Sequence, residues 1–154
     1  MELNHIDLPV ADIAGVRDFF VAHFGFRTIL KRDDGLAVLL DESNFALTLS
    51  ALIPGEAQRY PSGFHVGFNL NSEAQVRAAH DRLVAEGVEI VRPLGDLGGA
   101  LTFHCVAPGA LLVELAWRTR QAPGAGAGDH APATPQAYRE AQTEPPPETH
   151  SMQI

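Results

Sequence analysis

Apolar and polar positions in the first 51 residues alternate first with the period of a strand and then with that of a helix. Residues 3–10 (LNHIDLPV) place apolar side chains at every second position, which is typical of a half-buried strand. From Val16 to Phe24 the apolar side chains return at helical spacing, with Asp12 as the predicted N-cap and Gly25 as the terminating residue. Three further short strands are predicted near 26–32, 35–41 and 44–51.

The same order of elements returns after a joint at residues 52–62, which is rich in proline and glycine. A strand is predicted over 63–70, followed by a helix that begins after Ser72, with Gln75 completing a capping box, and ends at Gly87. The remaining strands are expected near 88–93, 100–106 and 110–118. The predicted fold class is therefore α+β, with two βαβββ modules over residues 1–51 and 63–118.

The two halves are related by a shift of 60 residues, which places His5 on His65. The same shift superimposes the two predicted N-caps, Asp12 and Ser72. A duplicated module with a polar residue near its pseudo-symmetric centre usually builds one site between the halves. We therefore expect both histidines to contribute to one site, and we expect that site to hold a metal.

Alternation along the strands gives each predicted sheet one apolar and one polar face. The apolar faces belong under the two helices, so we expect a curved mixed sheet with the helices on its outer side. The polar faces are too hydrophilic for a second core and are predicted to line a solvent-accessible concave cleft. The side chains on these polar faces come from His5, Asp7, Thr48, Ser50, His65, Asn69, Thr102, His104, Glu114 and Arg118.

Two imidazoles and one carboxylate on three separate strands of this polar set match a metal-binding pattern. Such a set binds a divalent metal and leaves coordination positions open for a substrate. Imidazole and carboxylate suit Fe(II), Mn(II), Ni(II), Co(II) and Zn(II), and the ligand types alone do not choose among these ions. The expected cofactor is one divalent metal ion per site. For any single histidine on a strand, the alternative is a hydrogen-bonded structural role.

Composition narrows the classes of partner. The chain has 154 residues, of which 45% are hydrophobic, enough for one packed domain. Its formal net charge of −8 argues against nucleic acid and anionic membranes as partners. The single cysteine, Cys105, excludes an intramolecular disulfide, and we expect a cytoplasmic protein because no signal peptide is visible. No apolar run approaches the roughly 18 residues of a membrane helix.

The composition changes from Thr119 onward. Residues 119–154 are rich in alanine, glycine and proline and nearly free of large apolar side chains. Such a segment buries too little surface to offset the entropy of ordering it, so a disordered tail is predicted. The folded domain is accordingly expected to span residues 1–118.

The strand motifs resemble those of the vicinal oxygen chelate superfamily, which includes glyoxalase I, fosfomycin-resistance enzymes, extradiol dioxygenases and bleomycin-resistance proteins. The resemblance covers residues 3–118 and is carried by NHIDLPVADIAGVRDFFVAHFGF, GFHVGFNLNSEAQVRAAHDRLVAEGVEI and TFHCVAPGALLVELAW. It implies metal ligands at the positions of His5, Thr48, His65 and Glu114. Threonine is not an expected ligand, so the remaining His/His/Glu set resembles the fosfomycin-resistance and extradiol branches more than four-ligand glyoxalase I.

Several positions depart from the patterns of these branches. The position ten residues before the metal glutamate is often tyrosine in the superfamily and is His104 here. We take His104 as a candidate general acid or base because imidazole titrates near neutral pH, the alternative being a hydrogen bond across the cleft. Ser50 stands where the extradiol branch has its base histidine, and Asp7 where the fosfomycin branch has a threonine. The candidates for substrate contact or for orienting the ligands are Asp7, Thr48, Ser50, Asn69 and Arg118.

Two functions from different classes are compatible with these residues. The first is a metal-dependent enzyme acting on a small oxygen-bearing substrate that the metal chelates. The second is a drug-binding protein without catalysis, of the bleomycin-resistance type, for which the acidic charge would suit a cationic ligand. The complete His/His/Glu set favours the enzyme. The resemblance also implies a homodimer whose subunits can exchange halves.

Overall fold

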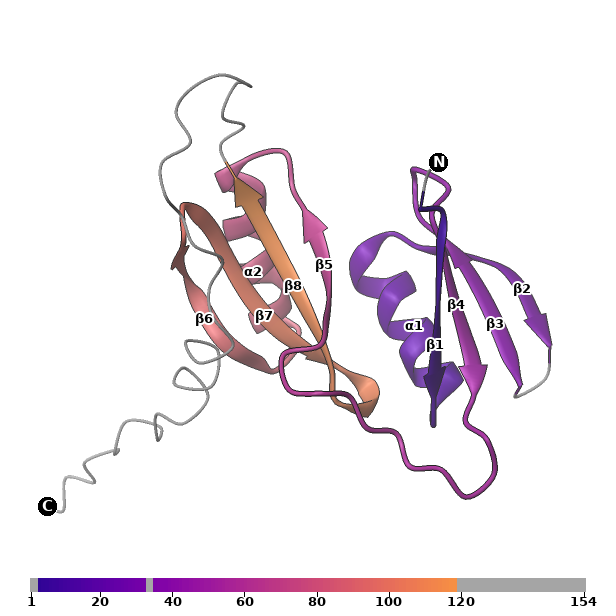
Figure 1. Cartoon of the computed structure of the whole chain (residues 1–154). Helices are drawn as coiled ribbons and strands as arrows, with labels where there is room; N and C mark the ends of the chain where they lie inside the picture. Colours follow the sequence, from indigo (N-terminus) through magenta and orange to yellow (C-terminus); the bar gives the residue numbers. More distant parts are fainter. Residues whose placement is uncertain (1–2, 33–34, 119–154) are drawn as a thin grey trace, which may run out of the picture. The chain divides into compact units, whose positions relative to one another are not determined.

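The computed structural model describes residues 3–32 and 35–118, which form two copies of a βαβββ unit (Figure 1). Each copy has a four-stranded mixed sheet and one long helix, which confirms the predicted α+β class. The predicted disordered tail, residues 119–154, lies outside the described residues. None of the described helices is long and apolar enough to cross a membrane.

The first module begins with a strand and a capped helix, as the sequence predicts. Asp12 is the N-cap and accepts a 2.8 Å hydrogen bond from the Gly15 amide, while Gly25 ends the helix in the left-handed conformation with φ of 71°. Its sheet has the order β1-β4-β3-β2, with β1 parallel to β4. The elements are β1 (His5–Val10), α1 (Ile13–Phe24), β2 (Arg27–Arg32), β3 (Leu36–Leu40) and β4 (Ala46–Ala51).

The second module repeats this order, and its sheet runs β5-β8-β7-β6. The Ser72 side chain caps the helix by accepting from the Gln75 amide, as predicted. The Gln75 side chain accepts in return from the amide of Asn71, one residue earlier than in a standard capping box. The elements are β5 (His65–Asn69), α2 (Glu73–Ala85), β6 (Ile90–Leu97), β7 (Ala100–Ala107), the short 3-10 helix η1 (Pro108–Ala110) and β8 (Leu111–Arg118).

Strand β6 differs from its predicted span of 88–93. It continues to Leu97, and its pairing with β7 is interrupted twice, between Ile90 and Arg92 and between Arg92 and Gly95. Each such bulge inserts a residue and reverses the alternation of faces. The apolar pattern therefore fades in the sequence although the strand continues.

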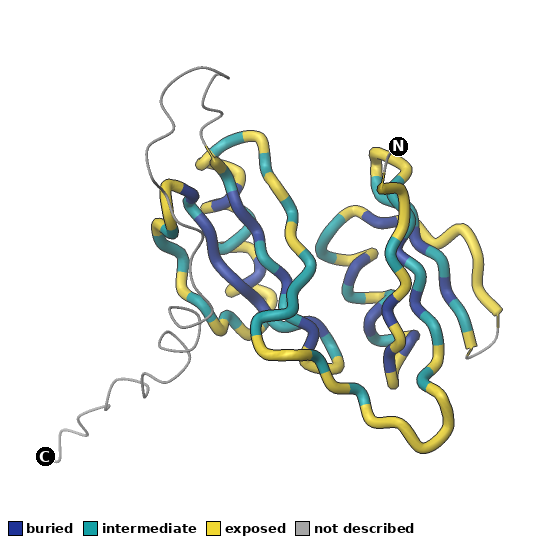
Figure 2. The backbone as a smooth tube through the Cα atoms, viewed as in Figure 1, coloured by how far each residue is buried: buried dark blue, intermediate teal, exposed yellow. Residues whose placement is uncertain are grey.

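The core lies between each helix and one face of its sheet, and buried segments follow β3, β4, β7 and β8 in Figure 2. Leu8, Val10, Leu47 and Leu49 are buried, as their alternation predicts. Cys105 also faces the core, and burial raises the pKa of its thiol to about 11. At neutral pH this thiol is protonated and unreactive.

The two modules contact each other through α1 and through the joint between them. The ring of Phe24 on α1 stacks on Phe68 of β5, with centroids 5.0 Å apart and an interplanar angle of 8°. In the joint, Gln58 accepts from the Ala11 amide at 2.8 Å and donates to the Gly109 carbonyl at 2.9 Å. A Cβ at Gly109 would collide with Gln58, so this glycine lets the joint close.

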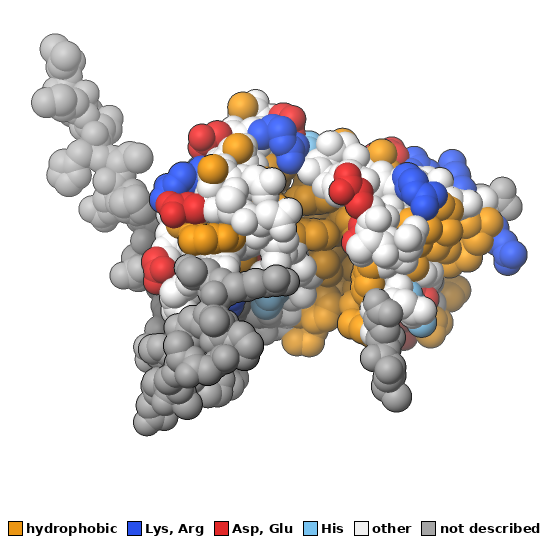
Figure 3. Space-filling model, turned by 90° about the horizontal axis from the view of Figure 1, so that it is seen from above, with side chains coloured by type: hydrophobic (Ala, Val, Ile, Leu, Met, Phe, Trp, Pro, Cys, Tyr) orange, Lys and Arg blue, Asp and Glu red, His pale blue; other side chains and the backbone are white. Residues whose placement is uncertain are grey.

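Some large apolar side chains remain on the surface. Ile29 and Leu30, both on the edge strand β2, are 49% and 38% exposed. Figure 3 shows hydrophobic side chains grouped on one face of the molecule, with charged side chains beside them.

Candidate metal centre

Each module carries one half of a potential metal centre at equivalent positions. In the parallel pairs β1–β4 and β5–β8, Asp7 lies opposite Thr48 and Gly67 opposite Glu114. Asp7 and Gly67 are equivalent under the repeat, so Thr48 and Glu114 are equivalent as well. This equivalence defines two half-sites: His5 with Thr48 in the first module, and His65 with Glu114 in the second.

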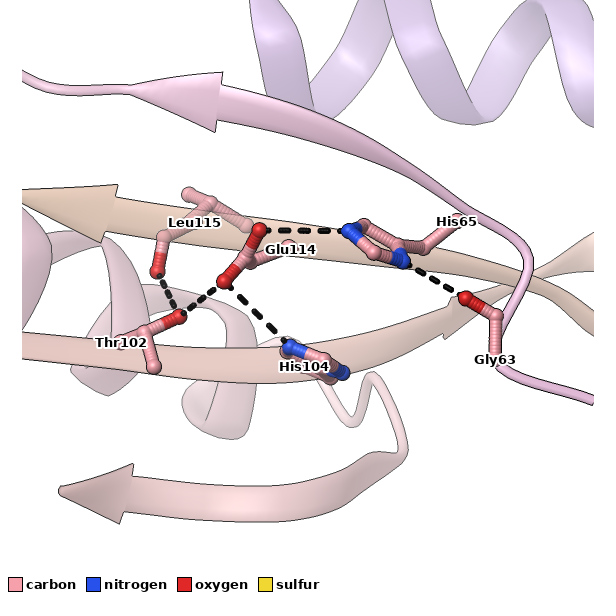
Figure 4. Close-up of polar contacts among 6 residues, drawn as sticks. All are labelled: Gly63, His65, Thr102, His104, Glu114 and Leu115. Atoms are coloured by element: carbon pink, nitrogen blue, oxygen red, sulfur yellow. Dashed lines mark hydrogen bonds and ion pairs between the residues drawn. The ribbon is translucent and has the colours of Figure 1, made fainter. Parts of the chain in front are cut away.

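In the second module, His65 and His104 both face the carboxylate of Glu114 (Figure 4). His65 Nε2 lies 3.3 Å from Glu114 Oε2, and His104 Nε2 lies 3.6 Å from Oε1. The two imidazole rings are 5.5 Å apart and nearly parallel, at 26°. Three neighbouring strands, β5, β8 and β7, thus bring two imidazoles and one carboxylate together.

The proton on His65 is fixed by a backbone carbonyl. His65 Nδ1 lies 2.8 Å from the carbonyl oxygen of Gly63, which can only accept a hydrogen bond. Nδ1 therefore carries the proton, and Nε2 of the neutral ring keeps its lone pair. This second contact is the usual way in which a protein orients a metal-binding imidazole.

Glu114 is held as a carboxylate. The facing His104 imidazole, the Thr102 hydroxyl and the His65 ring together lower its pKa to about 2, although burial acts in the opposite direction. Thr102 Oγ1 lies 3.1 Å from Glu114 Oε1 and 3.0 Å from the Leu115 carbonyl oxygen. A charged oxygen is the form of the side chain that binds a cation.

These residues fit a divalent metal ion by two further observations. A Cβ at Gly67 would lie 3.4 Å from Glu114 Oε2, so the glycine leaves space beside this oxygen and the His65 ring. The Nε2 atom of His104 is buried and has no hydrogen-bond partner among the described residues. Imidazole nitrogen and carboxylate oxygen are ligands that first-row divalent metals accept.

In the first module, His5 lies on the exposed edge strand β1, with Nδ1 2.7 Å from Asn4 Oδ1. Ser50 donates a 2.8 Å hydrogen bond to Asp7, and Thr48 is half-buried beside them. Within residues 3–32 and 35–118, no three His, Cys, Asp or Glu side chains are arranged so as to hold a metal by themselves, and this includes His65, His104 and Glu114. The structure thus brings His65 and Glu114 together but does not add His5 to them.

Two residues of the predicted cleft are not open to solvent. Thr102 is 1% and His104 is 4% exposed, so the expectation that they line a solvent-accessible cleft is wrong for this pair. Strand alternation assigns a side chain to a face but does not say what covers that face. Asn69 and Arg118, on the same strands as His65 and Glu114, are exposed as expected.

Sequence reasoning gave Gly67 and Thr102 no part in the metal site, and it did not consider Arg92. Gly67 follows His65 by two residues, and Thr102 precedes His104 by two, so alternation along the strand was the available signal. Arg92 pairs with His104 across β6 and β7, which directs its side chain to the same face. The bulges of β6 hid this placement from any regular pattern.

Comparison with known proteins gives a family match over most of the chain. The sequence model described as Glyoxalase/Bleomycin resistance protein/Dioxygenase superfamily matches residues 2–115. A solved structure described as a possible glyoxalase from Bacillus cereus is 35% identical, with a TM-score of 0.65, covering 75% of this chain and 97% of that chain. No curated protein sequence matches this chain.

Two more distant structures share the fold. A lactoylglutathione lyase from Agrobacterium tumefaciens is 18% identical, with a TM-score of 0.63 and coverage of 75% of this chain and 92% of that chain. A mutant of the fosfomycin resistance protein FosX from Listeria monocytogenes, in complex with Mn(II) and a dihydroxypropylphosphonic acid, is 20% identical. Its TM-score is 0.64, and the match covers 77% of this chain and 91% of that chain.

Proposed function

Because the chain belongs to the glyoxalase/bleomycin resistance protein/dioxygenase superfamily, we propose that it is a metal-dependent enzyme acting on a small oxygen-bearing substrate. The proposed ligands of one divalent metal ion are His5, His65 and Glu114. The observation that carries the proposal is the pair of His65 Nε2 and the ionised Glu114 carboxylate beside the space left by Gly67. The FosX complex with Mn(II) and a dihydroxy compound supports a divalent metal and a substrate with neighbouring oxygens.

The residues of the proposed site have two roles: some would bind the metal, and one would transfer protons. When bound, a divalent metal acts as a Lewis acid that stabilises negative charge developing on a substrate oxygen. His65 offers Nε2 because the Gly63 carbonyl holds its Nδ1 proton. The hypothesis that His104 is a general acid or base stays a prediction. Its Nε2 is turned to Glu114, which leaves Nδ1 as the atom that a substrate proton could reach.

The metal centre is proposed to be shared between two copies of the chain. Within one chain, α1 contacts β5, and Gln58 of the joint bonds to the second module. In this arrangement His5 does not join His65 in a metal-binding group. A homodimer with exchanged halves would supply His5 from the partner. The exposed apolar residues of β2 are surface that a second copy could cover.

A drug-binding protein of the bleomycin-resistance type is the alternative. The net charge of −8 is the observation that favours it, because it suits a cationic ligand. Such a binder does not require metal ligands, so metal binding separates the two functions.

Thermal unfolding with and without Mn(II) tests the proposal. Wild-type protein at a hundredfold excess of Mn(II) over its Kd should gain about 2.7 kcal/mol of stability, because the ion binds only the folded state. His65→Ala should lose this gain, whereas His80→Gln, at a partly buried position of α2 that packs on Phe103, should keep it. A wild-type melting temperature that no divalent metal raises would argue against a metalloenzyme and for the drug-binding alternative.

A further inference from the structure

The two oxygens of Glu114 lie in different surroundings (Figure 4). Oε2 faces His65 Nε2 and the space beside Gly67. Oε1 faces Thr102 and His104, which are 1% and 4% exposed. One oxygen is therefore turned to the metal position, and the other is turned to two buried polar side chains.

Strand pairing fixes the contact between His104 and Glu114. These residues are direct partners in the antiparallel pair β7–β8, so their side chains project from the same face. Cβ atoms of such partners lie about 5 Å apart, and any long side chain at position 104 must meet the carboxylate. The contact is thus a property of the sheet and does not depend on a mobile loop.

The protons available to Oε1 identify the donor. His104 Nε2 faces Oε1 at 3.6 Å and has no other hydrogen-bond partner among the described residues, so the tautomer with its proton on Nε2 can donate to Oε1. The Thr102 hydroxyl has one hydrogen but two acceptors, Glu114 Oε1 and the Leu115 carbonyl oxygen. His104 is then the second source of a hydrogen bond for Oε1. At 3.6 Å the present contact is longer than a hydrogen bond, and a shift of a few tenths of an ångström would form one.

We propose that His104 is a positioning residue for Glu114. Its Nε2–H, together with the Thr102 hydroxyl, holds Oε1 so that Oε2 alone is presented to the metal. This assignment rests on the proposed metal function and goes beyond it, because it makes Glu114 a ligand through a single oxygen. Without the donor at position 104, the carboxylate is free to rotate and its binding geometry is lost.

Mn(II) affinity of three variants tests the assignment, measured by the electron paramagnetic resonance signal of free Mn(II). His104→Leu fills a similar volume without a donor and should weaken the affinity about 10- to 100-fold, the usual effect of removing a group that orients a ligand. His104→Gln has a side-chain N–H that can reach Oε1, and it should stay within about threefold of wild type. Thr102→Val, which removes only a hydroxyl, should weaken the affinity in the same direction and keeps the test informative if His104→Leu does not fold. Melting of the metal-free proteins controls for folding.

Three outcomes would overturn the assignment. Equal losses in His104→Leu and His104→Gln would make the imidazole nitrogen itself a metal ligand. Unchanged affinity in both variants, with only the turnover of a substrate reduced, would make His104 a general acid or base. If wild-type protein bound no Mn(II), the metal function itself would fail, and with it the role of His104.

Discussion

Charge at the second half-site is concentrated on a single side chain, Glu114. Its carboxylate meets two imidazoles and one hydroxyl while only 16% of the side chain is exposed. In a site of this kind, removing one partner leaves the others unsatisfied, so small substitutions have effects beyond their size. Gly67 contributes by having no side chain at all.

The low pKa of Glu114 predicts a pH dependence of stability in the metal-free protein. The pKa falls from 4.5 to about 2 on folding, so the carboxylate stabilises the fold fully above pH 4.5 and loses this contribution as the pH falls towards 2. The full contribution is on the order of 3 kcal/mol. Urea unfolding in the presence of a chelator should reveal this loss in wild type, and Glu114→Gln should lack it. If Glu114→Gln lost stability at low pH as wild type does, the loss would come from other carboxyl groups.

Gly67→Ala is predicted to weaken metal binding more than it weakens folding. Its Cβ would sit 3.4 Å from Glu114 Oε2, in van der Waals contact, and would fill the space beside this oxygen. We expect a loss of about tenfold in Mn(II) affinity, comparable to other changes around metal ligands. Gly95→Ala is the matched control, because its Cβ would meet nothing closer than 4.0 Å. Equal Mn(II) affinities of Gly67→Ala and Gly95→Ala would mean that the space beside Gly67 is not needed for metal binding.

At the scale of elements, the sequence predicted what local physics decides. The caps Asp12 and Ser72 and the buried faces of β1 and β4 follow from side-chain chemistry and strand period. The end of β6 could not be predicted, because its bulges break the period. The burial of His104 and the separation of His5 from His65 depend on tertiary packing that one sequence does not display. The residue types of the candidate site were therefore easier to predict than which of these residues lie close together and how far they are buried.

The two N-caps should behave as an equivalent pair. Asp12→Ala and Ser72→Ala each leave one helix amide without its acceptor, which costs about 1 kcal/mol of stability. Neither residue belongs to the metal site, so Mn(II) affinity should not change. Chemical denaturation of both variants checks the first expectation and metal titration the second. A Ser72→Ala protein with wild-type stability would show that the cap observed on α2 contributes little.

For the whole molecule, the main consequence of the fold is that the proposed ligands fall into two unlike half-sites, each made of one edge strand and the inner strand beside it. One offers His5 with Thr48 and the other His65 with Glu114. Since only the second contains a carboxylate ligand, two copies of the same half cannot complete the proposed set. The complete set needs both kinds of half, from one chain or from two.

Mixing two inactive variants distinguishes these routes. Refolded heterodimers of His5→Ala and Glu114→Ala chains contain one site with both lesions and one intact site if the halves are exchanged. If each chain builds its own site, every site in the mixture carries a lesion. Mn(II) binding by the separated heterodimer, at one ion per dimer, is the result expected from exchange. Complete absence of binding would assign the site to a single chain.

Titration of metal-free protein with Mn(II) tests the central claim most directly. Calorimetry of wild type should give one ion per chain, because each chain contributes one His5, one His65 and one Glu114. His5→Ala, His65→Ala and Glu114→Gln should each weaken binding by orders of magnitude while the metal-free proteins remain folded. Wild-type binding that survives all three substitutions, or no binding by wild type of Mn(II), Fe(II), Co(II), Ni(II) or Zn(II), would contradict the assignment of a His/His/Glu metal centre.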